Sequence, residues 1–207
     1  MVSIFQLGQE KPSVTDRLEN AYMECELIAR NASSSFFRSF RHLPTNKRRA
    51  VNSLYAFCRR VDDIVDGDWL PDQDLSHLNE QAENRSIQLS IDKQLEPLND
   101  DVNHIKKLRS LLWYRINLDK IEHGEAVSEP IFIALSDVIK KFPVELDNLR
   151  ELISGMEDDL YCAKYQRFED LRRYCYRVAS TVGLCLVEIY GYSDCLLYTS
   201  PSPRDNR

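Results

Sequence analysis

The stretch NKRRAVNSLYAFCRRVDDIVDG occupies residues 46–67 and contains the densest helical pattern of the chain. Its apolar side chains recur every three or four residues, at Val51, Leu54, Tyr55, Phe57, Cys58, Val61 and Val65. Side chains at this interval share one face of an α-helix. Asn46 is a residue type that caps the amino end of a helix, and Gly67 suits the left-handed conformation that ends one. The pattern predicts an amphipathic helix over residues 46–67.

Similar patterns extend on both sides of this stretch. They predict further helices near residues 14–31, 75–91, 101–123, 129–141, 145–161 and 168–191. Glycine and proline are scarce, with 6 Gly and 8 Pro among 207 residues, and several of them fall between the predicted helices. No segment alternates apolar and polar side chains as a strand does, and no repeat is visible. The sequence therefore predicts an all-α fold.

Composition and charge exclude several classes of protein. The formal net charge of −6 disfavours broad electrostatic binding to nucleic acid. No apolar run reaches the roughly 18 residues that span a bilayer, so no transmembrane segment is predicted. The N-terminal stretch MVSIFQLGQEKPSV lacks the features of a signal peptide. The six cysteines form no CxxC pair and no zinc-binding spacing with the four histidines. We therefore expect a cytoplasmic protein with reduced, structural thiols.

Four chemically active side chains share one stripe of the predicted helix over 46–67. Tyr55, Arg59, Asp62 and Asp66 follow one another at intervals of four, three and four residues. Two carboxylates one helical turn apart repel each other unless a cation lies between them, and Mg²⁺ prefers such oxygen ligands. The planar guanidinium of Arg59 can bind phosphate oxygens. The stripe predicts a magnesium and phosphate site, and a solvated acidic helix face is the alternative.

Charge is segregated around this stripe. Residues 30–49 contain six basic and no acidic residues, whereas residues 62–74 contain six acidic and no basic ones. A basic segment close to an acidic helix end suits a metal–diphosphate ligand. Ser33, Ser34 and Ser35 lie in the basic segment, where hydroxyls and backbone amides can contact phosphate. The alternative is that these serines only interrupt a helix.

Four stretches of the chain resemble the squalene/phytoene synthase family of head-to-head prenyl-diphosphate synthases. They are NASSSFFRSFRHLP (31–44), RRAVNSLYAFCRRVDDIVDG (48–67), LISGMEDDL (152–160) and RFEDLRRYCYRVASTVGL (167–184). The resemblance implies an isoprenoid-synthase-type helical bundle, incomplete in this chain. It also implies Mg²⁺-dependent condensation of two farnesyl or geranylgeranyl diphosphates through a cyclopropyl diphosphate intermediate. The product would be squalene, dehydrosqualene or phytoene, and NADPH would be needed only for squalene.

The resemblance also implies roles for residues that bind the diphosphate and the metal. Ser33 and Ser35 match serines that contact the diphosphate, as do Tyr55 and Arg59. The Mg²⁺ ligands would be the two ends of the first aspartate-rich motif, Asp62 and Asp66. Asp63 lies inside this motif.

Further matched residues concern the prenyl chain and catalysis. Phe36 and Phe40 match aromatic residues near the prenyl chain, and Tyr174 matches a tyrosine proposed to take part in catalysis. Val178, Val182 and Gly183 match residues that line the prenyl tunnel. Helical spacing places Val178, Val182 and Cys185 on one face, and Gly183 leaves room for a close approach; ordinary core packing is the alternative.

One acidic position of the resemblance has no assigned role. Asp159, in GMEDDL, matches a recurrent acidic residue of the family whose function the sequence does not show.

The resemblance divides the chain into two parts. Residues 14–193 look like the N-terminal part of a squalene/phytoene synthase domain. We expect residues 194–207 to be an artefactual or disordered tail, because LLYTSPSPRD resembles translated adapter or vector sequence. The family's second aspartate-rich motif is not found in these 207 residues. We therefore expect this chain by itself to be inactive and poorly stable.

Two other functions stay open from the sequence. A chain-elongating isoprenyl diphosphate synthase would prefer longer aspartate-rich motifs, and a non-catalytic helical interaction module would use the acidic stripe only as solvated surface. The expected partner is a prenyl diphosphate, with no nucleic acid. The lipidic substrates and products leave peripheral membrane contact open, and the oligomeric state is not specified.

Overall fold

The computed structural model describes residues 13–32, 34–98, 101–161 and 164–191, and the regular structure within these ranges is helical. The helices are α1 (Val14–Ala32), α2 (Ser34–Phe40), α3 (Thr45–Asp66), η1 (Ser76–Leu78), α4 (Asn79–Lys93), α5 (Asp101–Glu122), α6 (Pro130–Lys141), α7 (Leu146–Asp159), α8 (Phe168–Cys175), η2 (Tyr176–Ser180) and α9 (Thr181–Tyr190). The all-α prediction is confirmed for this part of the chain. The proposed tail over 194–207 lies outside the described residues.

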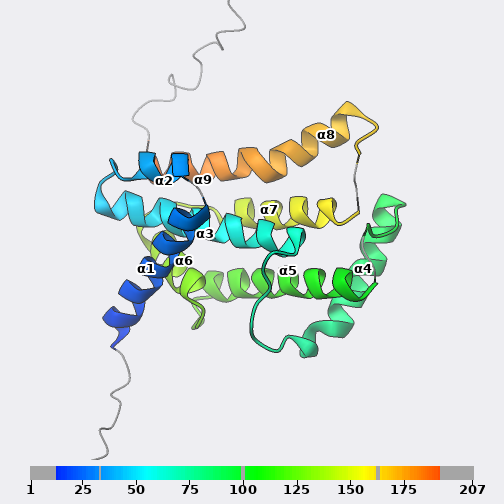
Figure 1. The fold of residues 1–207 in the computed structure, drawn as a ribbon, viewed down its shortest axis with the longest axis horizontal. Coiled ribbons are helices and arrows are strands. Elements are labelled where there is room, and N and C mark those ends of the chain that lie inside the picture. Colours follow the sequence, from blue (N-terminus) through cyan, green and yellow to red (C-terminus); the bar gives the residue numbers. More distant parts are fainter. Residues whose placement is uncertain (1–12, 33, 99–100, 162–163, 192–207) are drawn as a thin grey trace, which may run out of the picture.

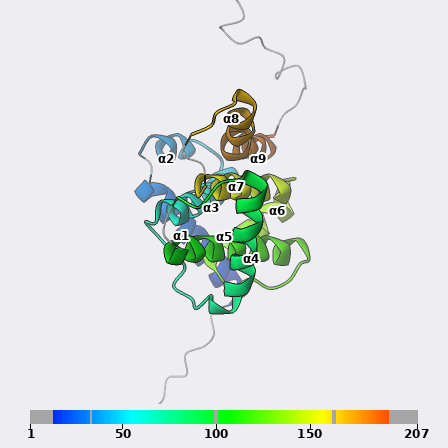
Figure 2. The same ribbon diagram turned by 90° about the vertical axis from the view of Figure 1, so that its right-hand side faces the viewer.

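Helix α3 is the central element of the bundle. It contacts α1, α2, α5, α6, α7 and α9. Figures 1 and 2 show α8 and α9 on one side of α7, with α5 on the other side. α4 packs against α5 at the end of the molecule where α7 gives way to α8. In the described ranges, no helix has the length and hydropathy needed to cross a membrane.

The ends of α3 agree only in part with the expected caps. Gly67 has a φ of 87° and donates its N–H to the carbonyl of Asp63, so it ends the helix as predicted. Asn46 is not the amino-terminal cap, because the helix already begins at Thr45 after Pro44. The Asn46 side chain instead accepts a hydrogen bond from the backbone of Lys47.

Two helical segments differ from the sequence-based expectation. Residues Ser34–Phe40 form the short helix α2, which the sequence pattern does not predict. The single helix predicted over 168–191 contains a π-helical turn, η2, between α8 and α9. Such wide turns within α-helices often occur at functional sites.

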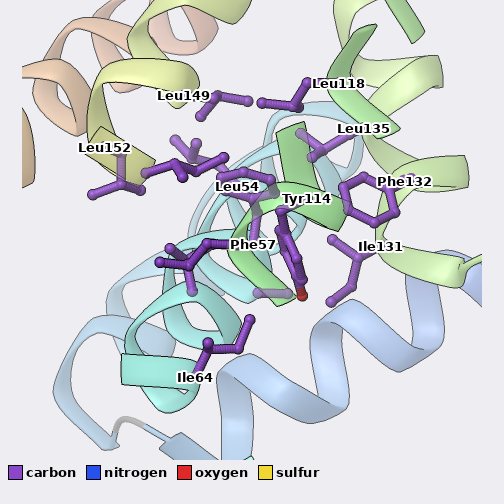
Figure 3. Packing of buried hydrophobic residues seen from close by; sticks show 14 of the residues in the cluster. Leu54, Phe57, Ile64, Tyr114, Leu118, Ile131, Phe132, Leu135, Leu149 and Leu152 are labelled. Carbon is purple, nitrogen blue, oxygen red and sulfur yellow. The ribbon is translucent and has the colours of Figure 1, made fainter. Parts of the chain in front are cut away.

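Aromatic rings from three helices form the centre of the core (Figure 3). The ring centroids of Phe57 and Tyr114 are 5.3 Å apart, and those of Tyr114 and Phe132 are 5.0 Å apart. Trp113 lies 5.3 Å from Phe132 in an edge-to-face arrangement. This geometry is the favoured one for aromatic pairs. The cluster therefore joins α3, α5 and α6.

A close approach of two helices occurs at Gly155 of α7. A Cβ atom built at Gly155 would lie 2.6 Å from Cγ1 of Val178 and 2.9 Å from Cβ of Arg177, both in η2. At Gly183 of α9 the described residues leave open space, because a Cβ built there would meet nothing within 4 Å. Only a residue without a side chain lets α7 lie so near the π-helical turn.

Replacing Gly155 by alanine is expected to lower the free energy of unfolding by about 1–3 kcal/mol, because the added methyl group overpacks the contact with η2. Gly183→Ala is the matched control. This substitution adds the same methyl group at a helical position where the methyl group meets no neighbour. It should leave the free energy of unfolding unchanged or raise it by up to about 1 kcal/mol. Urea unfolding measures both, and equal effects of the two variants would contradict the predicted crowding.

Candidate active site

The chemically active stripe of α3 is present in the structure, and its charges are divided unequally. Arg59 contacts Oδ2 of Asp62 at 3.1 Å and Oδ1 of Asp63 at 2.5 Å. Asp63 is buried and also pairs with Arg60, whereas Asp66 is exposed. Two arginines therefore neutralise Asp63. Within the described ranges, Asp62 pairs only with Arg59, which it shares with Asp63. Asp62 and Asp66 are more exposed to solvent than Asp63.

The carboxyl end of α7 brings a third carboxylate close to this pair. Asp159 is half-buried, and its pKa is raised to about 6 by burial and by the charges of Asp158, Asp62 and Asp66. The pKa of Asp62 is raised as well, first by burial and then by Asp66. These carboxylates therefore repel one another, and a cation between them would relieve the repulsion.

Tyr174 of α8 is tied to this carboxylate group. Its hydroxyl donates a hydrogen bond of 2.9 Å to Oδ2 of Asp159. Burial and this hydrogen bond hold the pKa of Tyr174 well above its usual value, so the phenol stays protonated. The structure thus brings the predicted residues Asp62, Asp66 and Tyr174 to one place through Asp159, the acidic residue whose role the sequence did not assign.

The shifted Asp159 predicts a dependence of stability on pH. The folded state keeps the proton of Asp159 up to about pH 6, whereas an unfolded chain releases it near pH 4. The folded state then binds more protons in this window, so the contribution of Asp159 to stability falls as pH rises from about 4 to about 6.

Replacing Asp159 by asparagine should flatten this part of the pH profile. It should also raise the free energy of unfolding at neutral pH by about 1 kcal/mol. This is less than the full pKa shift implies, because the Asp159 carboxyl is partly exposed to solvent. Urea unfolding at several pH values measures the difference between the two proteins. Identical slopes between about pH 4 and 6 would contradict the prediction.

The donor set fits a magnesium ion that is completed by its ligand. In the described ranges, no group of three His, Cys, Asp or Glu side chains is placed to hold a metal ion by itself. Mg²⁺ commonly takes only one or two protein carboxylates and fills its remaining positions with water and substrate phosphates. Asp62 and Asp66, one helical turn apart, supply oxygen donors of this kind with excess negative charge.

The other predicted residues fall into three groups. Phe40 is buried and meets Tyr55 edge-to-face at 6.3 Å, so these two lie together. Val178 and Val182 are partly buried against the core beside the buried Cys185. Ser33 lies outside the described residues, as do the side chains of Ser35 and Phe36, although these two belong to α2.

Part of the basic segment is used for internal contacts rather than for a ligand. Lys47 donates to the backbone carbonyl of Tyr190 at 2.6 Å, which ties α3 to α9. Arg49 forms a two-pronged ion pair with Glu19 of α1. The charge segregation seen in the sequence therefore serves helix packing at these two residues.

A cavity lies between α1 and α3, and Arg59 is part of its wall. Its volume is about 530 Å³, and its walls include the apolar residues Met23, Leu27 and Ile28 next to Arg59 and Asp63. No sequence pattern indicates this cavity, since it depends on how α1 crosses α3. Arg59 therefore both pairs with Asp62 and Asp63 and borders a partly apolar space.

Comparisons with known proteins agree with this arrangement. The family model for squalene/phytoene synthase matches residues 29–204. The chain is 29% identical over 174 residues to phytoene synthase 2, chloroplastic, of Solanum lycopersicum, covering 84% of this chain and 45% of the relative. It is 30% identical over 190 residues to 15-cis-phytoene synthase of Synechocystis, covering 91% and 46%.

Solved structures show the same likeness. A dehydrosqualene synthase in complex with ligand superposes with a TM-score of 0.62 at 25% identity, covering 86% of this chain and 50% of that one. A squalene synthase from Alicyclobacillus acidocaldarius has the same fold, with a TM-score of 0.62 at 24% identity, covering 87% and 55%. The chain thus spans about half the length of these relatives. Since the family model matches most of its residues, the chain belongs to the squalene/phytoene synthase family.

Proposed function

We propose that this chain carries the diphosphate-binding part of a prenyltransferase that condenses two prenyl diphosphates head to head. The substrates would be farnesyl or geranylgeranyl diphosphate. The reaction would pass through a cyclopropyl diphosphate to dehydrosqualene, phytoene or, with NADPH, squalene. Family membership and the phytoene and dehydrosqualene synthase relatives support this proposal. The single observation that carries it is the meeting of Asp62, Asp66, Asp159 and Tyr174.

The metal-binding role belongs to Asp62 and Asp66 in this proposal. A bound Mg²⁺ would supply the positive charge that neutralises the diphosphate and makes it a better leaving group. Arg59 is already within contact distance of Asp62, so its guanidinium can turn from that carboxylate to a phosphate oxygen. Tyr55 lies one helical turn before Arg59 on α3, and Phe40 of α2 packs against the Tyr55 ring.

Tyr174 and Asp159 act as a pair. The Tyr174 hydroxyl donates a hydrogen bond to Asp159, which fixes its orientation and leaves its oxygen lone pairs available to the reacting groups. The apolar neighbours Val178 and Val182 would exclude water from a reactive cation. Burying a fifteen-carbon prenyl chain would contribute on the order of 10 kcal/mol to substrate binding, at about 0.8 kcal/mol per methylene. The entropy lost when the chain is immobilised offsets part of this gain.

Replacing Asp62 by asparagine tests the proposal. Titration calorimetry of the 207-residue chain with farnesyl diphosphate should show binding that requires Mg²⁺. The Asp62→Asn variant should bind at least tenfold more weakly, because one ligand charge is lost from the metal. A change of tenfold corresponds to about 1.4 kcal/mol.

Asp72→Asn is the matched control, since Asp72 is an exposed aspartate of the same acidic segment beyond the end of α3. It should bind like the unaltered chain. Equal weakening in both variants, or Mg²⁺-independent binding, would overturn the proposal, and a non-catalytic helical module would show no such binding at all. We expect the 207-residue chain to lack turnover, and its release of diphosphate from farnesyl diphosphate would contradict that expectation.

A further inference from the structure

A second cavity lies away from the carboxylate group, between the end of α4, the end of α7 and the segment that leads into α8. This is the end of the molecule where α4 crosses α5 in Figure 1. Its volume is about 580 Å³. The cationic side chains that line it are Lys93, Lys164, Arg167, Arg173 and Arg177.

Two carboxylates in this cavity are each shared by two cations. Asp170 accepts from Nε of Arg167 at 2.9 Å and from Nη2 of Arg173 at 3.0 Å. The buried Asp158 pairs with Lys93 and, at 3.0 Å, with Nη1 of Arg177. Each of these carboxylates can offset only one of its two cationic partners.

The lining therefore carries more positive than negative charge. Asp92 is the third acidic residue of the wall, against five cationic side chains, and Glu151 outside the wall also pairs with Arg177 at 3.0 Å. Cationic groups therefore still outnumber carboxylates around the cavity. The whole chain has a net charge of −6, so this local excess runs against the overall balance. Guanidinium groups bind phosphate oxygens in a two-pronged geometry that ammonium groups do not match. A phosphate-bearing anion would therefore add negative charge where cationic groups are in the majority.

We propose that this cavity binds a phosphate-bearing polyanion, at a site separate from Asp62 and Asp66. The guanidinium groups of Arg167 and Arg173 are 77% and 62% exposed as side chains, so they can turn from Asp170 to an incoming phosphate. Lys93 and Arg177 are held at the inner wall by Asp158. Free diphosphate and the headgroup of an anionic phospholipid carry this same chemistry.

The cavity also contacts the candidate active site through one ring pair. Tyr165 lies in the cavity wall, and its ring centroid is 5.1 Å from that of Tyr174. The Tyr174 hydroxyl in turn donates a hydrogen bond to Asp159. An anion in the cavity would therefore lie one aromatic ring away from the hydrogen bond that orients Tyr174.

Titration calorimetry with inorganic diphosphate in the presence of EDTA tests this proposal. Without divalent metal the carboxylates of α3 repel the anion, so the basic cavity should account for any saturable binding. The double variant Arg167→Ser/Arg173→Ser should bind at least tenfold more weakly. Exposed ion pairs of this kind contribute little to stability, so the variant should unfold at nearly the same urea concentration as the unaltered chain.

Arg172→Ser is the matched control, because Arg172 precedes Arg173 on α8 but pairs with Glu169 and does not line the cavity. It should bind diphosphate as the unaltered chain does. The binding measured here is without divalent metal, whereas the proposed function requires Mg²⁺, so the two tests can fail separately. Absence of saturable binding, or equal weakening by Arg172→Ser, overturns the site for free diphosphate.

A second arm distinguishes the two sources of phosphate. Co-sedimentation with vesicles of phosphatidylglycerol, compared with phosphatidylcholine, measures binding to a lipid headgroup. Vesicle binding that the double variant loses, without binding of free diphosphate, assigns the cavity to a lipid phosphate. Failure of both arms overturns the proposal as a whole.

Discussion

The Glu157→Gln variant is expected to unfold with a free energy about 3 kcal/mol lower than that of the unaltered chain. The Glu157 side chain is only 3% exposed and lies between two arginines. Its Oε2 is 2.6 Å from Nη2 of Arg85 and 3.2 Å from Nη2 of Arg115. Glutamine keeps the shape but removes the charge, so two partly buried guanidinium groups lose their counter-charge. The partial exposure of both arginines places the effect at the lower end of the range for such changes.

Glu151→Gln is the matched control on the same helix. Glu151 also pairs with an arginine, Arg177, at 3.0 Å, but its side chain is 45% exposed. Its replacement should lower stability by less than about 1 kcal/mol. Urea unfolding followed by circular dichroism measures both variants. If Glu157→Gln were as stable as Glu151→Gln, the buried charge cluster would not be what joins α4, α5 and α7.

The second large effect is expected for Phe132→Ala, with a loss of about 3–5 kcal/mol. Phe132 is fully buried, and its ring lies 5.0 Å from Tyr114, 5.3 Å from Trp113 and 6.3 Å from Phe57. Truncation removes these contacts and leaves a cavity at the place where α3, α5 and α6 meet. The neighbouring rings are themselves closely packed and cannot move in to fill it.

Phe168→Ala controls for the chemistry of this substitution. Phe168 begins α8 and is 72% exposed, so the same truncation should change stability by no more than about 0.5 kcal/mol. Tryptophan fluorescence during urea unfolding reports directly on the Trp113 side of the cluster. Similar losses in the two variants would show that the cluster is not the centre of the core.

The fold was largely predictable because most helices have a clear apolar face, and because glycine follows the last residue of α3 and of α9. The helix predicted over 46–67 is observed as Thr45–Asp66. The helix α2 was not predicted because a seven-residue, serine-rich segment has a low intrinsic helix propensity. The position of Phe40 depends on its packing against Tyr55 of α3. The π-helical turn was missed because it faces Gly155, a contact between segments that are distant in sequence.

The candidate site was predictable only within one helix. Helical spacing placed Arg59, Asp62 and Asp66 on a common stripe, because that relation depends on the sequence interval alone. The approach of Asp159 to this stripe depends on how α7 packs against α3, and no local pattern contains that information. The short contact between Arg59 and the buried Asp63 could not be predicted either. Which of the neighbouring aspartates becomes buried depends on the helices that pack against α3.

Three consecutive acidic residues at the end of α7 restrict how the length of that helix can change. Successive helical residues point about 100° apart. Glu157 therefore reaches α4 and α5, Asp158 reaches α4 and η2, and Asp159 reaches α8. Inserting or deleting one residue within α7 would turn all three carboxylates together and exchange their partners. Length variation in this part of the protein should therefore be confined to loops such as that between α5 and α6, and α7 itself should keep a constant number of residues between Gly155 and Asp159.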